Sequence, residues 1–306
     1  MRQIPLHGLD GANPLGFLAA LGLLRVLDAR SSVTARPRLS WVDEGRWRPV
    51  LHLHADAADP VEEVIADLAS WRGAPELELH YADKKTGEKE IYDLKAPPDV
   101  FLAFARAAGA AATPATRRLA DFAAAYATDI AIDGTGATKP TALHFTSGQQ
   151  KFLEMVREIV DKVVAEDIRE AMDLWRYTSP LPVLRWDVSG ERIYALSASD
   201  PSKEKAQGVP GANWLAFQAL PLFPSFPVGH RILTTAFSGS GNDFRFTWPL
   251  WAPPASLAAL RSLIAAPGLA RMSTEERKMR GIVAVLRSQV RRANKGYGSF
   301  CPPDPI

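Results

Sequence analysis

The opening of the chain constrains the fold more than any other stretch. Residues 4–27 read IPLHGLDGANPLGFLAALGLLRVL, a short apolar segment, a turn with two glycines and a run of leucine and phenylalanine. Asn13 before Pro14 is typical of an N-cap followed by the first helical position. Apolar side chains would cover nearly every side of this helix, which indicates burial. The sequence therefore predicts a strand, a turn and a central helix around which other elements pack.

The turn of this unit has two interpretations. Free N–H groups of residues 8–12 at the start of a helix would suit a phosphate. The lysine and hydroxyl residue of a nucleotide-binding loop are missing, and Asp10 would repel an anion, so a buried strand–helix unit explains the turn better. Gly16 and Gly22 lower helix propensity, which predicts close approach by another backbone or a ligand.

Composition sets the class of protein. Hydrophobic residues make up 47% and charged residues 23% of the positions, enough for a large core, and a length of 306 residues suits two domains or one large irregular domain. Prolines near residue 178 suggest an N-terminal α+β domain over 1–178 and a C-terminal hairpin and helical region over 179–306. No apolar run is long enough for a bilayer, and no signal peptide is recognisable, so we expect a cytoplasmic protein without a membrane partner. The single cysteine, Cys301, excludes a disulfide framework and a multi-cysteine zinc site.

Local patterns predict an α+β fold of irregular antiparallel hairpins with buried helices and a basic C-terminal helix. Alternation and turn residues predict hairpins within 38–54, 76–94, 184–198 and 232–248. Helical periodicity and caps predict helices over 59–70, 99–109, 115–126 and 146–175.

The strongest charge bias lies at the C-terminal end. From residue 271 onward, three acidic residues oppose the basic residues Arg271, Arg277, Lys278, Arg280, Arg287, Arg291, Arg292 and Lys295. On a helix Arg287 and Arg291 would be neighbours, with Arg292 and Lys295 extending the patch. Such a helix suits binding to a phosphate backbone, and a solvated helix face is the alternative.

Other stretches also place cations or amides where a nucleic acid would reach them. These candidates are Lys84 and Lys85 at a hairpin tip, Gln149, Gln150 and Lys151 at a helix start, Lys203 and Lys205 in a polar loop, and Asn242 in a glycine-rich turn. Each has a structural alternative: a solvated tip, a helix cap, a surface linker and the geometry of a tight turn.

The sequence offers no convincing catalytic or metal-binding constellation. His52 and His54 share a strand face without a local cysteine or carboxylate partner, so a solvated face is the default. Asp129 and Asp133 lack the remaining ligands of a calcium loop. We therefore expect no catalytic residues, no metal and no cofactor.

Residues 6–27, LHGLDGANPLGFLAALGLLRVL, resemble the opening of proteins encoded in type I-U (also called I-G) CRISPR loci. LHFTSGQQKFLEMV at 143–156 and GVPGANWLAFQALPLFP at 208–224 are similar in kind. The resemblance implies a non-enzymatic subunit of the surveillance (Cascade) complex, similar to its large subunit, which recognises the protospacer-adjacent motif and helps to open target DNA. It implies other effector subunits, guide RNA, target double-stranded DNA and a helicase-nuclease as partners.

Two alternatives belong to other classes. A metal-dependent nuclease or an accessory protein of the same defence locus would need a carboxylate or histidine ligand set, or a positioned acid–base pair. A scaffold would instead use its basic surface to bind an acidic protein.

Overall fold

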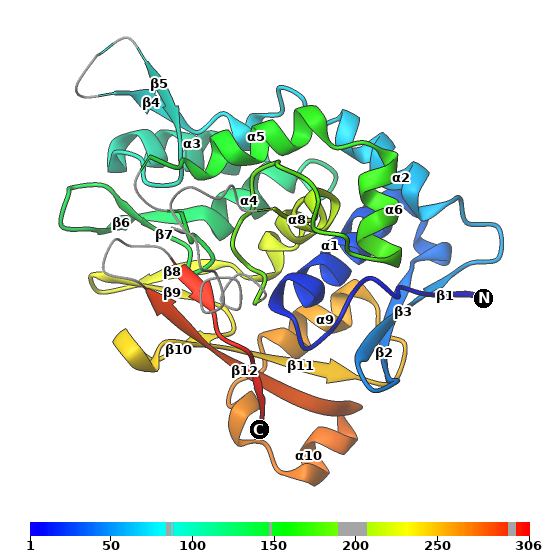
Figure 1. Cartoon of the computed structure of the whole chain (residues 1–306). Helices are drawn as coiled ribbons and strands as arrows, with labels where there is room; N and C mark the ends of the chain where they lie inside the picture. The colour runs from blue at the N-terminus through cyan, green and yellow to red at the C-terminus, as the bar shows by residue number, and fades with distance from the viewer. Residues whose placement is uncertain (84–86, 88, 147–148, 189–206, 293–297) are drawn as a thin grey trace, which may run out of the picture.

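Helix α1 (Pro14–Arg30) lies at the centre of the molecule (Figure 1). The computed structural model describes all residues except 84–86, 88, 147–148, 189–206 and 293–297. Every residue of α1 from Pro14 to Leu27 is buried, as the sequence predicts. The Asn13 side chain accepts the N–H of Leu15 over 3.0 Å, which confirms the predicted cap.

Helix α8 (Pro210–Gln218), also buried along its whole length, packs against α1. The two backbones nearly touch at Gly22, where a Cβ atom would lie 1.7 Å from the carbonyl oxygen of Leu215. At Gly16 a Cβ would lie 2.4 Å from the carbonyl oxygen of Asp10, in the preceding turn. Close backbone approach at both glycines was predicted from the sequence and is confirmed.

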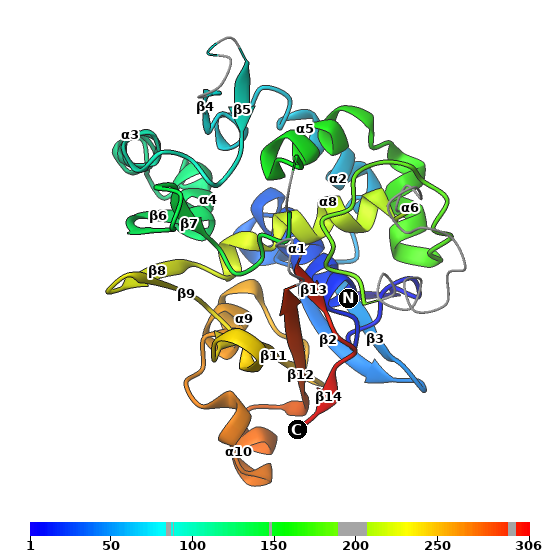
Figure 2. The ribbon, with the colours of Figure 1, turned by 60° about the vertical axis from the view of Figure 1, so that its left-hand side comes forward.

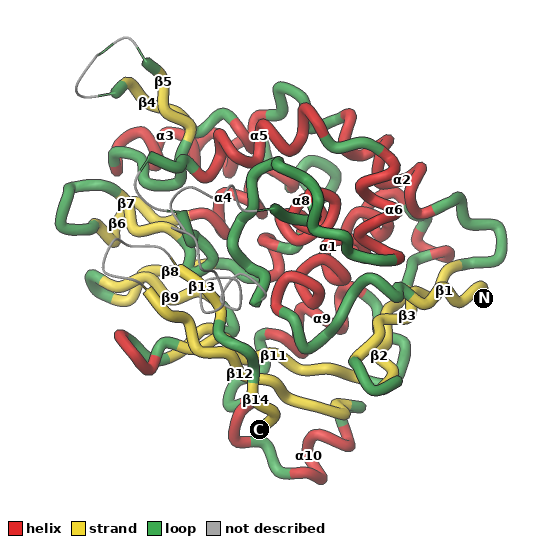
Figure 3. Tube along the Cα trace, in the orientation of Figure 1, coloured by secondary structure: helices red, strands yellow, loops and turns green. Residues whose placement is uncertain are grey.

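The remaining helices surround this central pair, and Figure 3 shows most of them gathered away from the main sheet. They are α2 (Pro60–Ala69), α3 (Pro98–Ala110), α4 (Arg118–Tyr126), α5 (Phe152–Lys162), α6 (Ala165–Asp173), α9 (Leu257–Ile264) and α10 (Thr274–Met279). The single helix predicted over 146–175 is therefore wrong. Val163 and Val164 adopt extended backbone between α5 and α6, and the Asp167 carboxylate accepts the N–H of Val164 to start α6.

The strands form small antiparallel sheets, which confirms the α+β class. The N-terminal sheet has the order β1 (Arg2–Pro5), β3 (Trp47–Leu53), β2 (Arg38–Asp43). The main sheet has the order β10 (Phe237–Ser238), β11 (Arg245–Trp251), β12 (Ile282–Arg292), β13 (Gly298–Phe300), and β14 (Asp304–Pro305) also pairs with β12. Three hairpins complete the set: β4 (His80–Ala82) with β5 (Glu90–Tyr92), β6 (Ala127–Ile132) with β7 (Thr138–Pro140), and β8 (Ser225–Val228) with β9 (Arg231–Thr234).

The basic C-terminal helix is the main error of the sequence prediction, because residues 282–292 form strand β12 (Figure 2). The run IVAVLRSQV is rich in β-branched residues, and its second half alternates between buried and more exposed positions. The spacing of its apolar residues fits both a helix and a strand, and pairing with β11 selects the strand. The hairpin predicted over 184–198 lies mostly outside the described residues, and residues 184–188 form no strand.

Aromatic rings join α1 to both larger sheets. Phe17 packs between Trp41 of β2 and Trp248 of β11, with ring centroids 6.0 and 5.8 Å away. The Trp248 indole donates to the Gly11 carbonyl over 2.9 Å, so its buried N–H is bonded. The core that contains these rings includes residues from both sides of position 178. The two-domain division stays a prediction.

Replacing Gly22 with alanine tests the contact between α1 and α8. The new Cβ would meet backbone atoms that cannot rotate away, so Gly22→Ala should lower the free energy of unfolding by about 3 kcal/mol. Urea denaturation monitored by circular dichroism measures the effect.

Gly109→Ala in α3 is the matched control. No atom lies within 4 Å of its added Cβ, so this variant should gain about 0.5–1 kcal/mol through helix propensity. Equal stability of the two variants would contradict the described packing.

Candidate nucleic-acid interface

The second half of β12 presents polar side chains on one face and core residues on the other. Leu286, Ser288 and Val290 are buried, whereas Arg287 and Gln289 are half-buried and Arg291 is exposed. Successive side chains of a strand point to opposite faces. Arg287, Gln289 and Arg291 therefore share the outer face of the main sheet.

Strand β11 adds a third arginine to this face. Arg245 lies directly opposite Gln289 in the antiparallel register and diagonal to Arg287 and Arg291. Diagonal neighbours are about 7–8 Å apart. We call these four residues, Arg245, Arg287, Gln289 and Arg291, the arginine face.

Two carboxylates border the arginine face. Asp243 lies 3.2 Å from Arg245, measured from Oδ1 to Nη2, and its side chain is largely exposed. Asp304 of β14 lies opposite Arg287 in the register. The face thus holds a net positive charge from three arginines, partly balanced by two aspartates at its edge.

The structure brings several of the predicted contact residues together. The backbone oxygen of Asn242, an exposed residue, accepts the Gln289 side-chain N–H over 2.5 Å, which places Asn242 beside the arginine face. In a strand, residues an even number of positions apart point to the same face. Arg287 and Arg291 therefore share a face in β12, as they would at positions i and i+4 of a helix. Arg292 ends β12, but its side chain lies outside the described part of the structure, as does all of Lys295.

The remaining predicted contacts fall into two groups. Lys84, Lys85, Lys203 and Lys205 lie outside the described residues. Gln149 is exposed and Gln150 is half-buried, both just before α5. The ammonium group of Lys151 lies 3.9 Å from Oδ2 of Asp93, a buried carboxylate.

Sequence reasoning missed Arg245 as a member of the site. A helix over 282–295 offers no reason to place Arg245 beside Arg287, because only strand pairing makes them neighbours. The alternation of buried and exposed positions over Leu286–Arg291 was the signal that could have found it.

A buried polar cluster around Asp93 holds the start of α5. Oδ1 of Asp93 accepts the N–H of Phe152 over 3.1 Å and lies 3.2 Å from Nε2 of His144. This carboxylate, from another part of the chain, accepts the first N–H of α5, and the helix begins at Phe152 rather than near residue 146 as predicted. Burial favours the neutral acid, but the His144 hydrogen bond and charge, the Phe152 N–H and Lys151 outweigh it and hold the pKa of Asp93 below its ordinary value.

The geometry of this cluster does not match a proton relay. Thr146 Oγ1 lies 2.9 Å from Nε2 of His144, the same ring nitrogen that faces Asp93. A nucleophile–histidine–acid triad uses the two ring nitrogens for different partners. The described atoms therefore support a structural role for the cluster.

His52 and His54, which were predicted to share a strand face, lie in different surroundings. His52 is buried, its Nε2 lies 2.8 Å from Ser40 Oγ, and burial lowers its pKa, so the predicted solvated face is wrong for this residue. His54 follows the strand, and its ring lies 3.5 Å from the Asp56 carboxylate on the surface. In the described part of the chain, no three histidine, cysteine or acidic residues lie close enough to share a metal ion.

Replacing Asp93 with asparagine tests the buried cluster. The change removes a charge that His144, Lys151 and the Phe152 N–H stabilise, so Asp93→Asn should lower the free energy of unfolding at pH 7 by about 2–4 kcal/mol. Because the folded pKa is depressed, the ionised carboxylate contributes this stability above the unfolded pKa. The contribution is lost as the pH falls through the folded value, so the stabilities of wild type and variant should begin to converge below about pH 4 and meet only below the folded pKa.

Denaturation over a series of pH values measures both effects. Asp56→Asn, which removes the exposed partner of His54, is the control and should leave stability almost unchanged. A wild-type advantage over Asp93→Asn that persists undiminished at low pH would contradict the assigned cause.

Comparison with known proteins provides no assignment for this interface. No protein-family model, curated protein or solved structure matches the chain. Over the described residues, no helix combines the length and apolar character that crossing a membrane requires. The function therefore has to be inferred from the residues and their geometry.

Proposed function

We propose that the chain is a non-enzymatic, nucleic-acid-binding subunit of a cytoplasmic type I CRISPR surveillance complex. The observation that carries the proposal is the arginine face, where Arg245, Arg287 and Arg291 stand together on one side of a sheet. Its role would be to hold target DNA or guide RNA through phosphates.

The spacing of the three arginines suits a phosphate backbone. A strand of duplex DNA carries one phosphate at every nucleotide, and side chains about 7 Å apart on a sheet are close enough to contact several phosphates of one strand. Arginine binds phosphate with paired N–H groups, and contacts of this kind fix position without reading sequence. Asp243 would be displaced from Arg245, and Asp304 would limit the path of the nucleic-acid strand at the edge of the face.

The arrangement of the three resembling stretches supports the family part of the proposal. Residues 6–27 contain most of α1, residues 143–156 include the first turn of α5, and residues 208–224 contain α8. Phe152 and Phe217 bring the second and third stretches together, with ring centroids 6.4 Å apart. The stretches are far apart in the sequence yet build one core, as expected of segments that define a common fold.

Sequence specificity in such a complex comes mainly from pairing between guide and target. A subunit of this kind needs phosphate contacts and at most a short contact to a flanking motif. The exposed side chain of Asn242 lies at the edge of the arginine face, and an amide can form two hydrogen bonds with adenine. We propose Asn242 as the group nearest to a base edge.

Charge reversal on β12 tests the proposal. Arg287→Glu combined with Arg291→Glu should weaken binding to labelled duplex DNA or single-stranded RNA by at least about tenfold and reduce the slope of log affinity against log salt by about two. Fluorescence anisotropy at several salt concentrations, with the chain in its purified complex, measures both quantities. The neutral pair R287Q/R291Q should give an intermediate loss.

Arg72→Glu combined with Arg106→Glu is the matched control, because it removes the same charge from exposed arginines at the end of α2 and in α3. This control should bind almost as wild type does. Equal losses in both double variants would indicate a net-charge effect, and unchanged affinity in a folded β12 variant would remove the arginine face from the site.

A further inference from the structure

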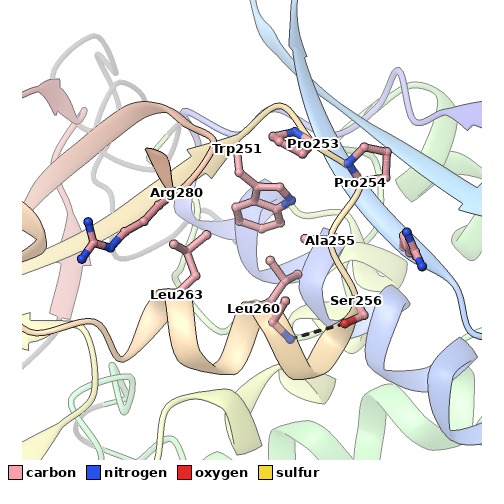
Figure 4. A pocket seen from close by; sticks show the side chains of 10 residues that line it. Trp251, Pro253, Pro254, Ala255, Ser256, Leu260, Leu263 and Arg280 are labelled. Carbon is pink, nitrogen blue, oxygen red and sulfur yellow. Dashed lines mark hydrogen bonds between the residues drawn. The ribbon is translucent and has the colours of Figure 1, made fainter. Parts of the chain in front are cut away.

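A second surface feature lies beside α9, at the other end of β12 from the arginine face. It is a pocket of about 380 Å³, within the size range of ligand-binding sites. Figure 4 shows the loop that follows β11 on one side, α9 below and Arg280 at the margin. We call it the α9 pocket; its lining residues include Arg38, Trp251, Pro253, Pro254, Leu260 and Arg280.

The walls of the α9 pocket are apolar and firmly held. The Trp251 indole N–H donates to the Leu39 carbonyl over 2.7 Å, and Leu39 also forms both backbone hydrogen bonds with Ala255, at 3.0 and 2.9 Å. Pro253 and Pro254 restrict the backbone of the loop between Trp251 and Ala255. A site that is already formed loses little conformational freedom when it binds a partner.

Two cations border this apolar surface. Arg38 and Arg280 are exposed, and no ion pair involves either of them among the described residues. The carboxylate of Glu276, one turn before Arg280, instead accepts the N–H of Ser273 over 2.8 Å. No acidic residue lines the pocket.

The side chains around the α9 pocket argue against a nucleotide as its ligand. Trp251 is 1% exposed, so its ring offers no open face on which a base could stack. The hydroxyl of Ser256 caps α9 by accepting the N–H of Ala259 over 3.4 Å. Nη1 of Arg280 donates to the Glu276 backbone carbonyl over 3.1 Å. The other N–H groups of Arg280 and those of Arg38 are then the side-chain donors left to a ligand, around walls that suit aliphatic groups.

We infer that the α9 pocket binds a partner protein through a segment in which apolar side chains are flanked by carboxylates. The apolar side chains would enter between α9 and the two prolines, and the carboxylates would pair with Arg38 and Arg280. Charge complementarity of this kind selects the partner and speeds association. The inference does not rest on the proposed nucleic-acid contact, because Arg280 precedes β12 and Arg291 lies near its end.

A short fluorescein-labelled peptide with leucines between glutamates is the probe, and its counterpart has glutamine in place of each glutamate. The acidic peptide should bind in anisotropy titrations, and the glutamine peptide should bind at least about tenfold more weakly. Arg38→Glu with Arg280→Glu should cause a loss of the same size. Ala259→Trp, at an exposed position of the pocket wall, should also abolish binding by filling the space without changing charge.

R72E/R106E and R287E/R291E should leave peptide binding unchanged, whereas the pocket variants should leave nucleic-acid affinity unchanged. Circular dichroism and the unfolding midpoint confirm that each variant is folded. Failure of the acidic peptide to bind, equal binding of the glutamine peptide, or full binding by Ala259→Trp would overturn the inference. Displacement of the peptide by single-stranded DNA, or conversion of a dimer to a monomer by the pocket variants, would assign the pocket to a polyanion or to a second copy instead.

Discussion

The close approach of α1 and α8 at Gly22 is the constraint on which the rest of the structure depends. Only a residue without a side chain lets the Leu215 carbonyl come this near, and the two helices pack together with α1 buried from Pro14 to Leu27 and α8 buried along its whole length. A buried arginine spans the same interface, because Arg25 donates to the Gln218 side chain over 3.0 Å and lies 5.0 Å from the Phe122 ring centroid. Burial lowers the pKa of Arg25 to about 10, so it stays protonated at neutral pH despite the desolvation.

The main sheet connects this central pair of helices to the surface of the molecule. Phe17 of α1 packs on Trp248, and Trp248 lies opposite Leu286 of β12 in the strand register. The inner face of β12 is thereby fixed to the core, and alternation then directs Arg287 and Arg291 outward. The proposed interface is a group of half-buried and exposed arginines on two paired strands whose other face is held by packing, which gives it a defined geometry.

Short-range sequence patterns correctly predicted the parts of the fold that depend on neighbouring residues in the chain. The Asn13 cap, the buried helix α1, the hairpins β2–β3 and β4–β5 and the close contacts at Gly16 and Gly22 all follow from short-range signals. Tertiary pairing decided the rest. Residues 282–292 carry apolar positions that fit a helix or a strand, and β11 supplies the partner that selects the strand. Asp93 caps α5 from 59 residues away, a distance that no local motif reveals.

The same distinction applies to the candidate site. The basic bias after residue 271 identified Arg287 and Arg291 as surface cations, because composition and spacing do not depend on the type of element. The membership of Arg245 and the position of Asn242 require the pairing of β11 with β12 and the Gln289 contact. The lining of the α9 pocket comes from β2, α9, the loop after β11 and Arg280 in the turn before β12, so it could not be predicted from any one stretch.

Copurification tests the central claim most directly. The tagged chain would be expressed with its neighbouring locus genes and a guide array, purified, and analysed for protein and RNA. The account predicts a stable complex that contains RNA of uniform short length and loses nucleic-acid affinity when β12 carries R287E/R291E. A chain that emerges alone, with neither RNA nor a protein partner, would contradict the account and favour an independent enzyme.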